Sequence, residues 1–269
     1  MTKYFKNFIK YRYLFWEIVR KNVKLQYRDS VLGIFWTFLQ PLLTTLVLVL
    51  VFGRVFGKSS EGVVSYPIYL LCGRLLYEFF SQATKRAMRS VSNSASVIKK
   101  VYVPKYIYPL ANVGSNFFTF LISLLVLVAM MAYYMIFTDT PLHITPYILL
   151  SVVPILVLLL LSIGVGLILS VLTVFFKDVE YLYEVFCLLL FYMTPIIYKL
   201  DQLVLKGWVS LGLKANPLYS IVSMFRSCVL FGEMWDWNWL YYSLGFSLLT
   251  VAVGMALFYK KQDKFILYL

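Results

Sequence analysis

Two charged side chains stand inside an otherwise apolar stretch of this 269-residue chain, where their chemistry would be electrostatic. Arg74 and Glu78 lie four residues apart, so a helix would place them on one face. If the stretch crosses a bilayer, each charge costs about 2.5 to 3.5 kcal/mol at the centre, so both should face protein or a water-filled cavity. Two interpretations stay open: a structural ion pair, or part of the lining of a transport path.

A segment similar to a phosphate-binding loop does not fit an ATP site. Residues 53–59 read GRVFGKS, but three residues separate the glycines where a Walker A loop has four. The only histidine is His143, and no HExxH motif or pair of carboxylates occurs inside an apolar stretch. The three cysteines are far apart and lack metal-ligand spacing. We therefore expect a chain that is not an enzyme and holds no metal or cofactor of its own.

The elements that must position these residues are apolar helices. The chain is 61% hydrophobic and 14% charged with a mean hydropathy of +0.80, whereas a soluble domain carries roughly a quarter charged residues. The sequence predicts an all-α polytopic membrane protein, because each apolar stretch approaches the ~20 residues that span a bilayer. The second stretch is short and needs continuation into 81–89, and the fifth is also short. The six predicted transmembrane helices are 34–52, 66–80, 110–137, 148–176, 182–197 and 239–259.

Two further segments are expected not to span. Residues 10–28 form an amphipathic helix with aromatic residues on one arc and basic residues on the other, which is typical of a helix in the plane of the membrane surface. An ordinary amphipathic helix packed on protein is the alternative. The apolar run 219–231 is too short to span and is predicted to be re-entrant or interfacial. The domain organisation is then an interface helix (1–30), a permease domain (31–260) and a tail (261–269).

The positive charge is distributed unevenly between the two sides. Of the 25 Lys and Arg residues, 18 lie in the N-terminal region, the 85–105 connection, the 177 loop and the C-terminal tail. The positive-inside bias places these parts, and both termini, in the cytoplasm. Arg74 stands inside a span, and the other six basic residues, Arg226 among them, are assigned to outer connections. Attraction to anionic lipid accounts for the net charge of +13, so nucleic acid is not expected as a partner.

Acidic and small residues have structural interpretations. Asp178, Glu180 and Glu184 open the fifth span, where Asp178 is expected to cap the helix and the others to complement its dipole. Small residues four apart, at 111, 115 and 119 and at 162, 166 and 170, are expected to be helix-packing surfaces or a dimer seam.

Five ordered motifs resemble the membrane subunits of bacterial ATP-binding-cassette exporters for polysaccharides, the O-antigen, capsular polysaccharide and teichoic acid exporters. The resemblance covers nearly the whole chain. One departure is the CGRLLY sequence at 72–77, where the family more often has an uncharged run with Trp after the glycine. The motifs are YRDSVLGIFW from Tyr27 with QPL from Gln40, KKVYVPKYIYPLANV from Lys99, VFFKDVEYLYEV from Val174, LLLFYMTPIIY from Leu188 and NPLYSIVSMFR from Asn216.

The resemblance implies a homodimer of six-span permeases in the bacterial plasma (inner) membrane. Each copy would bind a separate nucleotide-binding subunit, so that two ATPase subunits hold the ATP and Mg²⁺. The substrate would be a long glycan, often linked to polyprenyl pyrophosphate, moved outward between the two copies.

The resemblance also implies roles for particular segments. The family's coupling helix falls at 93–106, and its external gate falls at 199–238. Lys24, Arg28, Arg86 and Arg89 are expected near the inner interface, where paired basic groups can hold a pyrophosphate; general attraction to anionic lipid is the alternative. The coupling candidates are Val97, Ile98, Lys99, Lys100, Val101 and Tyr102, and the channel or gate candidates are Arg74, Tyr77, Glu78, Tyr198, Trp208 and Tyr219.

Three other classes compete with this interpretation. An ABC exporter permease for a drug or lipid shares the topology, and a glycosyltransferase gene neighbourhood would distinguish the two. A self-sufficient ion-coupled carrier would need midplane carboxylates and paired broken helices, which the sequence lacks. A membrane-bound glycan-processing enzyme would need convergent acid and base groups, which are also missing.

Overall fold

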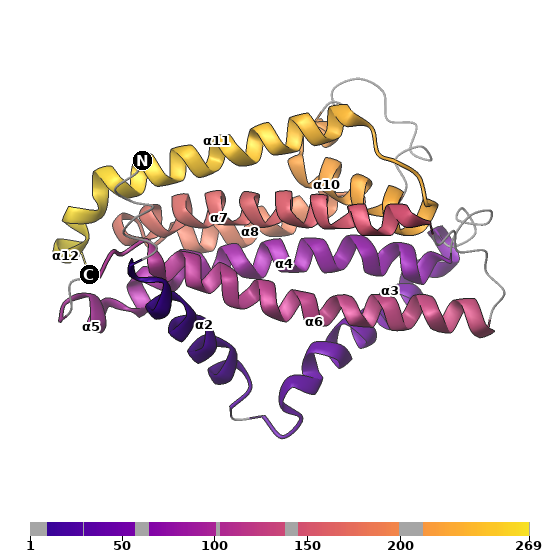
Figure 1. Cartoon of the computed structure of the whole chain (residues 1–269), viewed down its shortest axis with the longest axis horizontal. Helices are drawn as coiled ribbons and strands as arrows, with labels where there is room; N and C mark the ends of the chain where they lie inside the picture. The colour runs from indigo at the N-terminus through magenta and orange to yellow at the C-terminus, as the bar shows by residue number, and fades with distance from the viewer. Residues whose placement is uncertain are drawn as a thin grey trace.

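The computed structural model describes residues 10–28, 30–56, 65–100, 103–137, 145–198 and 212–268. Within these ranges every regular element is helical, so the predicted all-α class is confirmed. Figure 1 shows the long helices side by side, each antiparallel to the one before it. The α-helices are α2 (Arg12–Gln26), α3 (Trp36–Phe56), α4 (Tyr66–Asn93), α5 (Ala95–Ile98), α6 (Ile107–Phe137), α7 (Val152–Phe175), α8 (Val179–Met193), α10 (Pro217–Arg226), α11 (Trp237–Lys261) and α12 (Phe265–Tyr268). The short turns are η1 (Gly33–Phe35), η3 (Pro146–Ser151), η5 (Ser227–Phe231, π-helical) and η6 (Gln262–Lys264).

Four helices of the described chain are long and apolar enough to cross a membrane. They correspond to the first, third, fourth and sixth predicted spans, and the other two are α4 and α8. α8 has only 15 residues, about 22 Å at 1.5 Å per residue, which is shorter than a bilayer core of about 30 Å. α4 is long enough but carries five charged side chains. The four membrane-crossing segments are Gly33–Gly53, Ile107–Phe137, Pro146–Phe175 and Trp237–Lys264.

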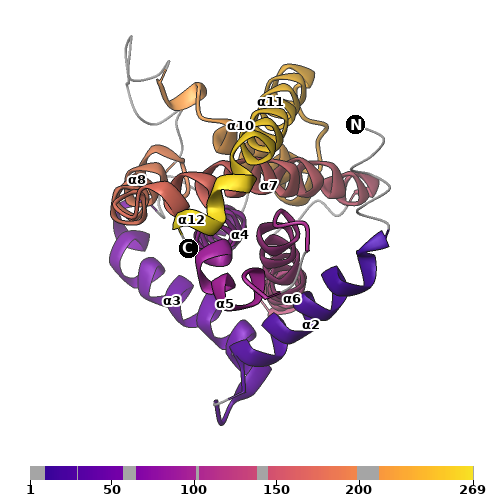
Figure 2. The ribbon, with the colours of Figure 1, turned by 90° about the vertical axis from the view of Figure 1, so that its left-hand side faces the viewer.

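α4 is the central helix of the bundle. It contacts α3, α6, α7 and α10, and the end view in Figure 2 places it between them. Residues 81–89 continue the same helix, as the sequence predicts, and this part is covered by protein: Ala83, Thr84 and Met88 are completely buried. Its polar character is therefore compatible with a position inside the bundle.

The fifth predicted span is shorter than expected. α8 ends at Met193 and not at residue 197, because Thr194 precedes Pro195 and has left the helical region (φ −89°, ψ 127°). The run 219–231 folds into α10 and η5, which pack against α4, α7, α11 and η3. Asn216 begins α10 by accepting a hydrogen bond from the Leu218 amide at 3.0 Å.

The N-terminal amphipathic helix is α2. Its apolar side packs on α6, where Val19 is buried and the rings of Trp16 and Phe118 lie 5.6 Å apart. Its basic side chains Arg20 and Lys24 are exposed. Figures 1 and 2 show α2 and α3 converging in a V whose point projects away from the bundle. Packing of α2 against α6 thus covers part of the apolar face of α2.

The small residues are packing surfaces within the chain. Ser162, Ser170 and Ser115 are buried, and a Cβ added to Gly166 would meet Ala87 of α4 at 2.8 Å. The predicted helix-packing role is confirmed, and the dimer seam stays a prediction. The closest approach joins α7 to α11, where a Cβ on Gly164 would lie 2.6 Å from the Val251 amide nitrogen.

Candidate functional site

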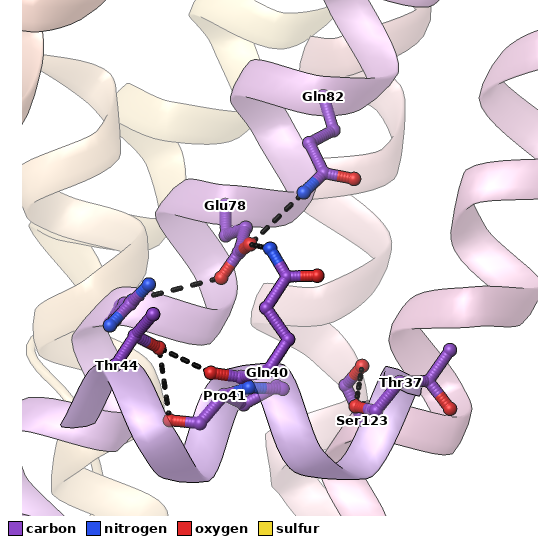
Figure 3. A network of polar contacts seen from close by, with 8 residues as sticks. Thr37, Gln40, Pro41, Thr44, Glu78, Gln82 and Ser123 are labelled. Atoms are coloured by element: carbon purple, nitrogen blue, oxygen red, sulfur yellow. Dashed lines mark hydrogen bonds and ion pairs between the residues drawn. The ribbon is translucent and has the colours of Figure 1, made fainter. Parts of the chain in front are cut away.

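Arg74 and Glu78 of α4 form an ion pair within a polar network. Arg74 Nε lies 3.7 Å from Glu78 Oε2, and both side chains are largely buried. Glu78 Oε1 accepts hydrogen bonds from Gln82 Nε2 at 3.0 Å and from Gln40 Nε2 of α3 at 3.4 Å, as Figure 3 shows. The network therefore joins α3 to α4. Glu78 Oε1 accepts two hydrogen bonds, whereas the buried Oε2 has the ion pair with Arg74 and no hydrogen bond.

The same pair faces a groove between α3, α4 and α8. The groove has a volume of about 500 Å³, and its floor is α4. The Tyr77 ring packs edge-on against Phe191 with centroids 5.1 Å apart, and its hydroxyl donates to the Cys187 carbonyl at 2.5 Å. The two interpretations left open for the charges are thus compatible, since the ion pair also lines a groove. The lining residues are Thr44, Val47, Leu48, Arg74, Tyr77, Glu78, Ser81, Gln82 and Phe191.

The four basic candidates for a pyrophosphate site do not form one cluster. Arg86 Nη1 donates to Gln26 Oε1 at 2.8 Å and so points to the end of α2, the part of the chain that carries Lys24 and Arg28. Lys24 and Arg28 are exposed. Arg86 is thus the candidate on α4 that lies beside α2.

Arg89, by contrast, points to α8. Its Nε lies 2.9 Å from Glu180 and its Nη2 lies 3.0 Å from Glu184. The two glutamates therefore bind a guanidinium in addition to complementing the helix dipole. Asp178 stands at the N-cap position but makes no capping hydrogen bond with its side chain, so that expectation is wrong in its detail.

The candidate coupling segment lies at the end of α4. The four-residue helix α5 buries Ile98 in a cluster with Tyr106, Val171 and Phe258, while Val97 is 45% exposed. The flanking Lys99 and Lys100 are also exposed. One side chain anchors the segment, and its neighbours are available to a partner. Val101 and Tyr102 lie outside the described residues.

Two of the remaining channel or gate candidates, Tyr198 and Tyr219, are described. The Tyr198 hydroxyl donates to the Tyr192 carbonyl at 2.7 Å. The Tyr219 ring packs edge-on against Trp239 of α11, with centroids 6.1 Å apart. Tyr219 is therefore an α10–α11 packing contact and does not line the groove. Trp208, with all of 199–211, lies outside the described residues.

Comparison with known proteins decides the family. Residues 13–230 match a protein family described as "ABC-2 type transporter". The chain is a member of the ABC-2 transporter membrane family. It is 28% identical to an O-antigen export system permease protein RfbA of Klebsiella pneumoniae, with 92% of each chain covered. It is 27% identical to the RfbA protein of Myxococcus xanthus over 98% of each chain. The polysialic acid transport protein KpsM of Escherichia coli is 25% identical over 90% of this chain and 91% of its own.

Membership of the ABC-2 family makes this chain a permease subunit and not an ATPase. The family match begins in α2 and ends in η5, so it contains the groove, the α2 end and the coupling segment. The one long helix beyond it is α11, which packs against α7. The candidate residues therefore belong to the part that this chain shares with other ABC-2 permeases.

Sequence reasoning missed one buried charged residue of this ABC-2 permease. Arg226 was assigned to an outer connection, but its side chain is completely enclosed, with a residue exposure of 4%. The signal was present in the sequence: Arg226 stands inside the apolar run 219–231, where an exposed arginine would be out of place. The hydroxyls of Tyr66 and Tyr69, two of the many aromatic residues, were also overlooked.

Proposed function

We propose that this permease subunit moves a polysaccharide, carried on polyprenyl pyrophosphate, from the cytoplasm to the outer side of a bacterial plasma (inner) membrane. Two copies pair, and each binds one ABC ATPase subunit that supplies ATP and Mg²⁺. Both α4 and α8 cross the membrane, which makes six spans with both termini in the cytoplasm. The observation that carries the proposal is the groove containing Arg74 and Glu78, in a chain whose relatives are named as polysaccharide exporters.

The lining of the groove suits a glycan. Hydroxyl groups of sugars exchange hydrogen bonds with carboxylates, guanidinium groups and amides, and their apolar faces pack on aromatic rings. Glu78, Arg74 and Gln82 offer the first kind of group, and Tyr77 and Phe191 offer the second. An apolar drug would gain little from an ion pair, so this lining favours a carbohydrate over the drug or lipid alternative.

Pairing of two copies follows from where the groove opens. A charged pair is not stable against lipid, so something other than acyl chains must cover it. The two helices beside the groove present apolar side chains outward, among them Val47 of α3, which lines the groove, and Val185 and Leu189 of α8. A second copy seated on these rims would close the groove into an enclosed path between the two chains.

Reconstitution tests the proposal directly. The permease is purified with the ATPase encoded beside it and placed in vesicles with a lipid-linked glycan. We expect the pair to hydrolyse ATP and translocate the glycan, and neither protein to do so alone. Transport of a drug or free lipid, with no glycan transport, would replace the proposal by the alternative exporter. Glycan transport by the permease alone would refute the ATP-driven mechanism.

The coupling segment has a separate test. We propose that Val97, Lys99 and Lys100 dock on the ATPase, because they are exposed while Ile98 anchors the helix. Charge reversal at both lysines with Val97→Asp should reduce glycan export at least tenfold while leaving the permease folded. Lys177→Glu, an exposed cytoplasmic charge change elsewhere, is the matched control. Export coupled to ATP hydrolysis in the triple variant would contradict the docking assignment.

The lipid head group is assigned to the end of α2. Arg89 pairs with two glutamates, whereas Arg86 bonds the neutral side chain of Gln26 at the end of α2, so we propose Arg86, Lys24 and Arg28 as the pyrophosphate candidates. Neutralising Arg28 should reduce export more than it reduces membrane insertion. Arg20→Gln removes an equally exposed charge from α2 and serves as the control. Equal losses in export and insertion, or equal effects of the two variants, would favour general attraction to anionic lipid.

A further inference from the structure

The chain between α8 and α10 leaves the helix at membrane depth, where unpaired backbone carbonyls are costly. Residues 194–198 form the outward bend, in which the Thr194 amide makes the last hydrogen bond of α8, to Leu190 O at 2.9 Å. Four consecutive carbonyls of the bend accept a hydrogen bond from a side chain. Arg226 donates to Pro195 O at 2.7 Å and Ile196 O at 3.1 Å, Tyr66 donates to Ile197 O at 3.1 Å, and Tyr69 donates to Tyr198 O at 3.3 Å.

We propose that Arg226 is a positioning residue that fixes the outward bend to α4. Besides the two carbonyls of the bend, Nη1 donates to the Tyr69 hydroxyl at 2.8 Å and Nη2 donates to the Tyr69 carbonyl at 3.1 Å. The guanidinium also lies 3.6 Å from the centre of the Tyr69 ring. Gly73 is needed beside it, because a Cβ there would overlap Nη2.

The choice of arginine at this position has a physical reason. A buried charge is expensive, and an apolar side chain of similar volume is often the more stable choice. The described contacts of Arg226 are carbonyl and hydroxyl oxygens and a ring, and no carboxylate is among them. A planar fork with five donors can reach two successive carbonyls and α4 at once, whereas a lysine ammonium cannot. Since the side chain is enclosed, it acts through the bend and does not touch the substrate.

Arg226, Tyr66 and Tyr69 together form a clamp on the outward bend. Further contacts join α4 to α8 along the length of α8. Tyr77 of α4 donates to the Cys187 carbonyl, and Tyr183 of α8 donates to the Thr84 hydroxyl at 2.7 Å. At the cytoplasmic end Arg89 pairs with the first turns of α8. α4 leads directly into α5. If the proposed function is correct, a movement of the coupling segment is therefore carried to the outward bend, because α4, α8 and the bend move as one body.

Native cysteines report on the clamp without any assumption about transport. Cys72, Cys187 and Cys228 are all buried, and the first and last lie beside Gly73 and Arg226. In native membranes, Arg226→Gln should raise the rate of N-ethylmaleimide modification of Cys72 and Cys228 at least tenfold, and Arg226→Lys should raise it less. The modification rate of Cys187 should change less than twofold, because the Tyr77 hydroxyl still donates a hydrogen bond to the Cys187 carbonyl. Lys214→Gln, an exposed change near the same end, is the control.

Unchanged modification rates in Arg226→Gln would overturn the proposal. A uniform rise at all three cysteines would also overturn it, because it would indicate general unfolding. Tyr69→Phe keeps the packing but removes a hydroxyl that bonds both Arg226 and Tyr198. It should give a smaller, equally local rise, and it keeps the proposal testable if Arg226→Gln does not fold.

Transport then distinguishes positioning from mere structural support. In the permease–ATPase complex, Arg226→Gln should lower glycan export at least tenfold while kcat and KM for ATP hydrolysis stay within twofold, and Arg226→Lys should restore part of the export. A parallel loss of export and ATP hydrolysis would reject the positioning role. Failure of the proposed function would instead show as no export by the wild-type complex, and the cysteine result would stand independently.

Discussion

Removing Arg74 and removing Glu78 should lower the free energy of unfolding of the protein by different amounts. At 3.7 Å and an effective dielectric constant of about 20, the attraction is about 4 to 5 kcal/mol before desolvation is counted. Arg74→Met leaves Glu78 with hydrogen bonds from Gln40 and Gln82, so we expect a cost of about 2 kcal/mol. Glu78→Met leaves Arg74 without its carboxylate and two amides without their acceptor, which should cost about 3 to 5 kcal/mol. Glu78→Gln keeps the shape and isolates the loss of charge.

The double variant is the decisive measurement. Arg74→Met with Glu78→Met should cost at least 1 kcal/mol less than the sum of the two single changes, because no charge is left unpaired. Unfolding in mixed micelles of a mild detergent and SDS gives the free energies from the midpoints and slopes. Additive effects within about 0.5 kcal/mol, or a larger cost for Arg74→Met than for Glu78→Met, would refute this account of the network.

Two packing predictions can be checked by the same unfolding titration. Gly164→Ala should destabilise by about 1 to 3 kcal/mol, because its Cβ would meet the backbone of α11 at Val251, whereas Gly245→Ala has open space and should stabilise by up to about 1 kcal/mol; a similar effect of both changes would contradict the close α7–α11 contact. Asn216→Ala should cost about 1 to 2 kcal/mol, since the side chain accepts from Leu218 N and donates to the Thr194 hydroxyl at 3.0 Å. Asn216→Asp, which keeps the acceptor and loses the donor, should cost less, and equal costs would argue against the capping bond.

The helices themselves were predictable from the sequence to within a few residues. Apolar stretches of about 20 residues have few alternatives to a helix when no water is present to satisfy the backbone. The errors fall where a local rule overrides hydropathy: α8 ends at Met193 because Pro195 follows, four residues before the apolar stretch stops. The continuation of α4 through 81–89 was predicted, but the reason it tolerates polar residues is its central place among other helices.

The candidate site was predictable in part. Spacing alone put Arg74 and Glu78 on one face, and the pair does form. Spacing could not divide the basic residues, because Arg86 and Arg89 stand three apart on α4 yet face α2 and α8. The partners come from segments far away in sequence, so their choice depends on how the helices pack. Arg226 was misassigned for the same reason.

The class of this protein, its helices and the bias of positive charge toward one side follow from the order of its residues, because each depends on composition and periodicity along the chain. Which charges pair, which helix faces are covered and where a groove remains depend instead on how the helices pack. The outward bend is the clearest case: Tyr66 and Tyr69 donate to carbonyls more than 120 residues away, and Arg226 donates to the two carbonyls that precede them. Hydrogen bonds between distant segments leave little periodic pattern in the sequence, whereas the burial of one helix face leaves a clear one.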